Sequence, residues 1–285
     1  MTGAIAMTGR ARRPTAAPSS RKLDFRYLDL ATRAPACYLE MGRPDAPALV
    51  FLHGFGGDLL TWHYCLVAFS SRFRVIALDL PGHGRSTMDV GGGTLAEMVS
   101  WTEQVLTALG IDTADFVGHS MGGKIAIALA LAHPHSVRSL SLISPAGLGG
   151  PFDLALLHRF LDCATPEAAR EVATRLVGSG SPILLETLAN SLVSLKDGSP
   201  QRRAFEALLG NTATIGESIG ERGVPWDRID GPIQVIWGEE DTILPLPASH
   251  RLPPGAPFTP LPGIGHLPQI ECPGRIVSLL DRFLP

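Results

Sequence analysis

The stretch DFVGHSMGGK, residues 115–124, places one serine between glycines at the junction of two different apolar patterns. The residues before it read as a buried strand, and the residues after it read as a helix. In so sharp a turn the middle residue, Ser120, is forced toward positive φ, which costs about 1–3 kcal/mol for a residue other than glycine. Gly118 and Gly122 remove the Cβ atoms that would clash across the turn. The turn therefore predicts a serine hydroxyl lifted clear of the backbone, with the Met121 N–H at the electropositive start of the helix.

Strands and helices alternate along the first half of the chain. Residues 48–52 and 75–78 are almost entirely apolar, which is typical of strands covered on both faces in a parallel sheet. Gly110 and Pro134 end two helical patterns. The predicted strands span 23–30, 36–41, 48–54, 73–80, 114–120 and 137–145, and the predicted helices span 94–109 and 121–134. This order indicates a parallel sheet built from right-handed βαβ units.

The alternation stops from residue 149 to residue 223, where only helical patterns occur, separated by glycine, serine and proline. We interpret this region as a compact helical cap inserted into the sheet. Strand patterns return at 232–238 and 257–263, and a helix closes the chain at 273–284. The predicted organisation is an α/β core of residues 23–148 and 224–285, a cap of residues 149–223, and a disordered basic arm of residues 1–22.

Composition narrows the class of partner. The chain has 285 residues, 45% hydrophobic and 18% charged, with a formal net charge of −3, so no nucleic-acid partner is expected. No apolar run reaches the roughly 18 residues that a membrane-spanning helix needs, and the four cysteines form no CxxC pair. Residues 1–22 are basic, without the apolar stretch of a signal peptide. We expect a cytoplasmic protein that acts on a small molecule, with no membrane partner, and we leave a homodimer open.

A serine nucleophile needs a histidine that takes its proton and a carboxylate that orients the histidine. The loop after the strand at 232–237 contains Asp241, and the loop after the last strand contains His266. Both loops would lie at the carboxyl ends of strands, beside Ser120. Two glutamates in the stretch WGEEDTILP (237–245) compete as the acid, and His250 competes as the base. Position in the chain favours Asp241 and His266.

The negative charge that develops on a substrate oxygen needs two backbone N–H donors. Met121 is predicted to supply one, and Phe55 the other, from the glycine-rich loop LHGFGGD (52–58). His53 and Asp79 are expected to hold this loop and the turn DLPGHGRS (79–86) in place. The residues predicted to contact substrate are Gly54 and Gly56 in the loop, His119 beside the serine, and Phe152 and Leu156 on an apolar face of the cap.

The histidines suggest no metal site, because no pair has HxxxH spacing on a helix with a nearby glutamate. We therefore expect neither a metal nor a cofactor.

Five stretches together resemble the α/β-hydrolase superfamily: FLHGFGGD (51–58), VIALDLPGHGRS (75–86), FVGHSMGGKIAIALA (116–130), VIWGEEDTILP (235–245) and PLPGIGHLPQIECP (260–273). In that superfamily G-x-S-x-G is the nucleophile elbow, and the acid and the histidine follow it in the order found here. The resemblance covers residues 24–285 and is closest to the hydrolase-like domain that ends the acyltransferase component of acetoin dehydrogenase complexes. It implies a mostly parallel, eight-stranded sheet flanked by helices, with an inserted helical cap.

The expected activity is hydrolysis of small carboxylic esters or thioesters through an acyl-enzyme on Ser120. Two related activities stay open: an acyltransferase, in which an alcohol or thiol replaces water, and a carbon–carbon bond hydrolase of ring-cleavage products. Hydrolases of this carbon–carbon type also resemble this chain, but Leu267 stands where those enzymes often have an aromatic residue after the histidine. A non-catalytic ligand-binding module is least favoured, because the serine, the acid and the histidine are all retained.

Overall fold

The computed structural model describes residues 23–148, 152–179, 182–193, 198–211, 219 and 223–285. The predicted basic arm, residues 1–22, lies outside the described residues. Residues 149–151 and 220–222, beside the two predicted ends of the cap, also lie outside them, so the cap boundaries stay a prediction.

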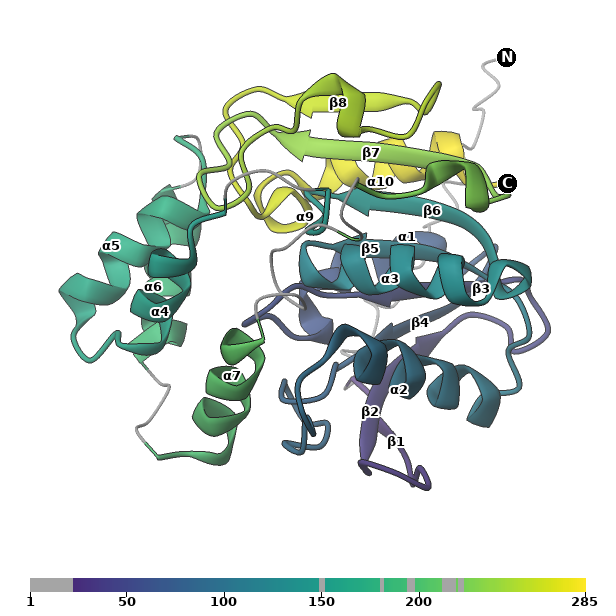
Figure 1. Cartoon of the computed structure of the whole chain (residues 1–285), viewed down its shortest axis with the longest axis horizontal. Helices are drawn as coiled ribbons and strands as arrows, with labels where there is room; N and C mark the ends of the chain where they lie inside the picture. Colours follow the sequence, from purple (N-terminus) through teal and green to yellow (C-terminus); the bar gives the residue numbers. More distant parts are fainter. Residues whose placement is uncertain (1–22, 149–151, 180–181, 194–197, 212–218, 220–222) are drawn as a thin grey trace, which may run out of the picture.

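Eight strands form one sheet in the order β1-β2-β4-β3-β5-β6-β7-β8 (Figure 1). They are β1 (Arg26–Leu28), β2 (Ala36–Met41), β3 (Ala48–Leu52), β4 (Arg74–Leu78), β5 (Ala114–His119), β6 (Val137–Ile143), β7 (Ile233–Gly238) and β8 (Phe258–Leu261). β2 pairs antiparallel with both β1 and β4, and all other neighbouring strands pair parallel. The predicted mostly parallel, eight-stranded sheet is confirmed, and each predicted strand overlaps one of these.

Helices cover both faces of the sheet (Figure 1). The helical segments of the core are the 3-10 helix η1 (Leu59–Trp62), α1 (His63–Phe69), α2 (Leu95–Ala108), α3 (Met121–Ala132), η2 (Pro134–Ser136), η3 (Trp226–Arg228), η4 (Ser249–Arg251), α9 (Pro268–Glu271) and α10 (Pro273–Phe283). The sequence interpretation missed α1, because its seven residues hold barely two turns of the helical period.

The alternation of side chains along each strand decides which residues pack against which helices. In β3, Val50 and Leu52 belong to the core formed with α2 and α3, whereas Leu49 and Phe51 belong to the core formed with α1 and α10. All four side chains are fully buried. A strand that is covered on both faces has no solvent side, which is why its sequence is apolar throughout.

Local sequence signals set the ends of two core helices, α2 and α3. Thr94 and Glu97 form a capping box at the start of α2, in which each side chain accepts the backbone N–H of the other. Gly110, at positive φ, follows the end of α2. Pro134 follows α3 and opens η2.

Four further helices lie between β6 and β7 in the chain: α4 (Leu154–Leu161), α5 (Pro166–Leu176), α6 (Pro182–Val193) and α7 (Pro200–Gly210). They form the helical insert that the sequence predicts as a cap, and in Figure 1 α4, α5 and α6 stand together beside the carboxyl ends of the strands. Thr165 and Ser199 cap the N-termini of α5 and α7, each followed by a proline in the first turn. Among the described residues, no helix combines the length and apolar character needed to cross a membrane.

Candidate functional site

Ser120 occupies the turn between β5 and α3, with φ +50° and ψ −117°. The flanking glycines permit this turn: a Cβ on Gly118 would lie 2.6 Å from Gly123 Cα, and a Cβ on Gly122 would lie 2.3 Å from the carbonyl oxygen of Leu52. Both contacts are with main chain, so neither can be relieved by moving a side chain. The sequence folds here into a tight elbow that carries Ser120 at the carboxyl edge of the sheet, beneath the cap.

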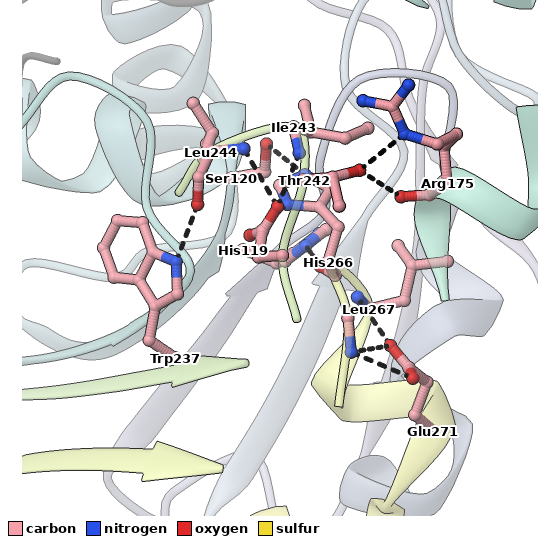
Figure 2. Close-up of polar contacts among 12 residues, drawn as sticks. His119, Ser120, Arg175, Trp237, Thr242, Ile243, Leu244, His266, Leu267 and Glu271 are labelled. Atoms are coloured by element: carbon pink, nitrogen blue, oxygen red, sulfur yellow. Dashed lines mark hydrogen bonds and ion pairs between the residues drawn. The ribbon is translucent and has the colours of Figure 1, made fainter. Parts of the chain in front are cut away.

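The structure brings His266 and Asp241 to Ser120 from two loops that lie more than a hundred residues along the chain. His266 Nε2 lies 3.1 Å from Ser120 Oγ, and His266 Nδ1 lies 2.7 Å from Asp241 Oδ2. Figure 2 shows His266 reaching toward Ser120. All three side chains are buried. With the Asp241 carboxylate as acceptor, Nδ1 carries the imidazole proton, which leaves Nε2 free to accept the serine proton.

Backbone hydrogen bonds hold Asp241 in its loop after β7. Its Oδ1 accepts the N–H groups of Ile243 and Leu244 at 3.0 and 2.9 Å, and this leaves Oδ2 for the imidazole. The indole N–H of Trp237 in turn donates to the carbonyl oxygen of Leu244 at 2.9 Å (Figure 2). The carboxylate therefore meets the histidine in a fixed orientation.

The other residues that the sequence offered as the acid or the base lie away from Ser120. Glu239, Glu240 and His250 are exposed, and the carboxylate of Glu240 accepts hydrogen bonds from Ser179 of the cap. Of the acids and histidines considered, the structure places Asp241 and His266 in line with the serine.

The glycine-rich loop after β3 passes directly over the elbow. A Cβ on Gly54 would lie 3.0 Å from Ser120 Cβ. In the part of the chain that the structure describes, the N–H groups of Phe55 and Met121 donate no hydrogen bond within the protein. The N–H of Gly56, by contrast, donates to His83 Nε2 at 3.0 Å. This geometry leaves the same two donors available that the sequence predicts for an oxyanion, and their catalytic role stays a prediction.

Two buried histidines hold the loop by their ring nitrogens. His53 Nδ1 donates to the carbonyl oxygen of Gly54 at 2.8 Å, and its Nε2 accepts the Leu80 N–H at 3.0 Å. His83 Nδ1 donates to the carbonyl oxygen of Pro81 at 2.9 Å, while its Nε2 accepts from Gly56 as described above. Burial lowers the pKa of His53, and burial together with the nearby His53 lowers the pKa of His83 to about 3. Both rings are therefore neutral, as an accepting nitrogen requires.

The carboxylate of Asp79 joins the two loops. Its Oδ1 accepts the Leu59 N–H and its Oδ2 accepts the Arg85 N–H, each at 2.8 Å. Burial raises the pKa of Asp79. The expected structural roles of His53 and Asp79 agree with these contacts. Sequence reasoning missed His83, because a single histidine in a Pro/Gly turn has no local pattern that points to its partner.

His119 precedes Ser120 in the chain, and its ring contacts the main chain of His266. Its Nε2 lies 2.7 Å from the carbonyl oxygen of His266, and the two rings are 4.9 Å apart. Burial holds the pKa of His119 well below its ordinary value, so the neutral ring donates its Nε2–H to that carbonyl. His119 therefore fixes the backbone of His266 while its ring lines a cavity above Ser120.

A cavity of about 100 Å³ opens above Ser120, between the core and the cap. Its wall is mostly apolar and includes Phe55, Phe152, Leu157, Phe160 and Leu244. Among the described residues that line it, none is an arginine, lysine, aspartate or glutamate. The cavity therefore suits an uncharged, apolar group beside Ser120.

The predicted substrate contacts fall partly on this wall. Gly54, Gly56, His119 and Phe152 line the cavity, whereas Leu156 does not and packs in the core. Leu157 takes that place, because successive residues of a helix point about 100° apart and the sequence did not show which face of α4 meets the serine. The cavity wall also includes Gln269, which sequence reasoning missed.

Gln269 is a buried carboxamide in a mostly apolar wall. It is 2% exposed, and within the described residues its Oε1 has no hydrogen-bond partner. It stands three residues after His266, on α9, and no spacing rule in the sequence marks it.

The described part of the chain holds no group of three or more histidine, cysteine, aspartate or glutamate side chains placed to bind a metal ion. The rings of His53, His83 and His119 instead make hydrogen bonds to main-chain atoms, and the ring of His266 makes them to the side chains of Asp241 and Ser120.

Comparison with known proteins places these residues in a family context. The alpha/beta hydrolase fold family matches residues 47–273. The chain is 31% identical over 239 residues to the dihydrolipoyllysine-residue acetyltransferase component of the acetoin cleaving system of Cupriavidus necator, a match that covers 84% of this chain and 64% of that protein. The chain thus spans somewhat less than two-thirds of that relative's length.

Two further relatives are named for different activities. The chain is 30% identical over 255 residues to 2-hydroxy-6-oxononadienedioate/2-hydroxy-6-oxononatrienedioate hydrolase of Paraburkholderia phymatum, covering 83% of this chain and 86% of that protein. A solved structure described as Est816, an N-acyl homoserine lactone degrading enzyme, has a TM-score of 0.76 and 26% identity, covering 91% of this chain and 100% of that one. These similarities agree with the resemblance seen in the five motifs.

Proposed function

The chain belongs to the α/β-hydrolase fold family, and on that premise we propose that it is a serine hydrolase of small to medium carboxylic esters or thioesters with uncharged, apolar acyl groups. The observation that carries the proposal is the continuous hydrogen-bonded line from Ser120 through His266 to Asp241, under an apolar cavity. The buried carboxylate and the imidazole supply what a serine lacks at neutral pH, a base already oriented to accept its proton.

In the proposed reaction, Ser120 Oγ attacks the carbonyl carbon of the substrate while its proton passes to His266 Nε2. Asp241 stabilises the imidazolium that forms, and the N–H groups of Phe55 and Met121 bind the negative oxygen of the tetrahedral intermediate. When the intermediate collapses, the leaving alcohol or thiol takes the proton from His266 Nε2, and the acyl group stays on Ser120. Water then attacks the acyl-enzyme and gives a proton to His266 Nε2. The second tetrahedral intermediate collapses with release of the acid, and His266 returns that proton to Ser120 Oγ, which restores the serine.

The cavity wall favours this substrate class over a dicarboxylate. The Paraburkholderia phymatum relative is named for a substrate with two carboxylates, and a buried site for such a dianion would need cationic side chains. The described wall of this cavity offers Gln269 and neutral imidazoles, but neither arginine nor lysine. A carbon–carbon bond hydrolase of dicarboxylates therefore fits this site less well.

The name of the Cupriavidus necator relative supports an acyltransferase as the second candidate. The chemistry up to the acyl-enzyme would be the same, and a second alcohol or thiol would then replace water. Product analysis with a competing alcohol or thiol distinguishes the two: a hydrolase releases the free acid, and a transferase forms the new ester or thioester at millimolar acceptor.

Replacement of Ser120 by alanine tests the proposal. The variant should lose turnover of p-nitrophenyl butyrate by at least about 10³-fold and should no longer react with a fluorophosphonate probe, while its circular dichroism spectrum is unchanged. Ser100→Ala, at an exposed position of α2, is the matched control and should keep both activities. If the folded wild-type protein does not react with the probe, a ligand-binding role replaces the proposed hydrolase.

A further inference from the structure

The loop that carries the acid is fastened to the end of a cap helix. The last turn of α5 and the residues after it, from Arg175 to Ser179, are called the α5 terminus below. Arg175 Nε donates to Thr242 Oγ1 at 3.1 Å, and Thr242 Oγ1 donates to the carbonyl oxygen of Arg175 at 2.9 Å (Figure 2). The Ser179 N–H donates to Glu240 Oε2 at 2.7 Å. Thr242 and Glu240 are the two neighbours of Asp241, so the α5 terminus holds this loop on both sides of the acid.

The α5 terminus also meets the loop that carries the base. The N–H of His266 donates to the carbonyl oxygen of Leu176 at 2.8 Å. Main chain touches main chain here, because a Cβ on Gly265 would lie 2.5 Å from Gly178 N and a Cβ on Gly178 would lie 2.2 Å from Gly263 O. Leu176 also lines the cavity. The cap residue that a substrate would contact therefore also binds the main chain of His266.

One carboxylate, that of Glu271 in α9, joins these two segments. Its Oε2 accepts the Gly178 N–H at 2.7 Å, and its Oε1 accepts the Leu267 N–H at 3.1 Å. The Gly265 N–H donates to both oxygens, and each lies 3.1 Å from the Gly265 nitrogen. Figure 2 shows Glu271 with its contacts to Leu267 and the loop. Gly265 and Leu267 are the two neighbours of His266. The proposed reaction gives Glu271 no chemical step, yet it binds the main chain on both sides of the base and the cap at once.

A carboxylate is the side chain that this arrangement needs, because it accepts hydrogen bonds at both oxygens and donates none. A glutamine has one accepting oxygen. If that oxygen faces Leu267 and Gly265, the amide NH₂ points at the Gly178 N–H and the contact with the cap is lost. If it faces Gly178, the NH₂ points at the Leu267 N–H and the contact with the loop of His266 is lost.

We propose that Glu271 is a positioning residue, which holds the loop of His266 against the α5 terminus, so that the distance from His266 Nε2 to Ser120 Oγ depends on a docked cap. This inference rests on the proposed function of Ser120 and His266. It names a residue outside the catalytic line whose loss moves the base, and it assigns to the cap a part in assembling the site as well as in covering it.

The test compares Glu271→Gln with Glu186→Gln in the same assays. Glu186 is an exposed cap glutamate that pairs with Arg170 on the surface, so its variant makes the same chemical change in the cap without touching either loop. With p-nitrophenyl butyrate, E271Q should lower kcat about tenfold to a hundredfold and change KM by less than about twofold. The rate constant for fluorophosphonate labelling should fall by the same factor as kcat. E186Q should match the wild type throughout.

A purely structural role for Glu271 would give a different pattern. It would lower the fraction of protein that labels, while the folded molecules would label with the wild-type rate constant. Hydrogen exchange provides a readout that does not depend on activity: peptides containing Gly178 and Gly265 should exchange faster in E271Q, and peptides from β3 and β5 should not. Should E271Q fail to fold, Glu271→Asp keeps the charge but is one methylene shorter, and the same reduction in labelling rate constant is expected.

Wild-type values of kcat, labelling rate constant and amide exchange in E271Q would overturn the proposal. Ser120→Ala, measured beside it, separates this failure from that of the proposed function. If the alanine variant is inactive while E271Q behaves as wild type, only the positioning role is wrong. If the alanine variant still turns over substrate, the proposed function itself is wrong.

Discussion

Replacing Ser120 with glycine should leave a more stable protein than replacing it with alanine. Ser120 has φ +50° and ψ −117°, a conformation that residues with a Cβ rarely adopt. Alanine keeps the Cβ in this conformation and glycine removes it. Both variants lose the hydroxyl and its contact with His266, so the difference in stability between them reports the backbone alone.

The expected magnitude follows from two opposing terms. A residue with a Cβ held in such a region is destabilised by about 1–3 kcal/mol. Glycine has more freedom in the unfolded chain, which disfavours the glycine variant by about 0.5–1 kcal/mol. The free energy of unfolding of S120G should therefore exceed that of S120A by about 1 kcal/mol, or about 2–4 °C in melting temperature for a chain of this size.

Urea denaturation of both variants measures the difference in their free energies of unfolding. A second pair of variants shows the sign of that difference at an unstrained position. Ser100 lies exposed in the interior of α2, where Ser100→Gly should be less stable than Ser100→Ala by about 1 kcal/mol. The two sites should thus show opposite signs. If S120G is also less stable than S120A, the elbow is not strained and the reasoning about its geometry is refuted.

Three further outcomes are expected. The pKa of His83 is lowered from its ordinary 6.5 to about 3, so between these pH values the unfolded chain holds a proton at His83 that the folded chain lacks. The contribution of His83 to the free energy of unfolding is therefore fully present above pH 6.5, and it should fall by about 1.4 kcal/mol per pH unit as the pH drops toward 3. His83→Gln should reduce this slope by that amount in urea titrations at stepped pH, and an unchanged slope would contradict the neutral ring. Phe160→Ala removes a ring from the wall beside Gly56 and should raise the kcat/KM ratio of octanoate to butyrate esters about tenfold, whereas Phe258→Ala, on the exposed edge strand β8, should leave the ratio unchanged. Gly122→Ala would place a Cβ 2.3 Å from a main-chain oxygen of β3 and should lower the free energy of unfolding by about 3 kcal/mol; wild-type stability in denaturant would show that the elbow can relax.

The sequence by itself determined the order of the eight strands, the helical insert, and the residues of the line from Ser120 to Asp241. These follow from local signals: continuous apolar runs mark buried strands, glycines on both sides of Ser120 mark a turn that only they permit, and parallel strands bring their carboxyl ends to one edge. Because Asp241 and His266 each follow a strand of the same sheet, their nearness to the serine could be expected from the sequence.

Only the tertiary structure decided which side chains support that line. Three side chains join segments that share no periodicity or motif. They are His83, which contacts the loop over the serine, Gln269, which lines the cavity, and Glu271, which contacts the cap. The face of α4 that meets the serine, with Leu157 in place of Leu156, is likewise set by how the cap docks. Such contacts depend on how separately formed elements pack against one another, and a hydrogen bond between distant main-chain groups leaves no pattern in the residues that make it.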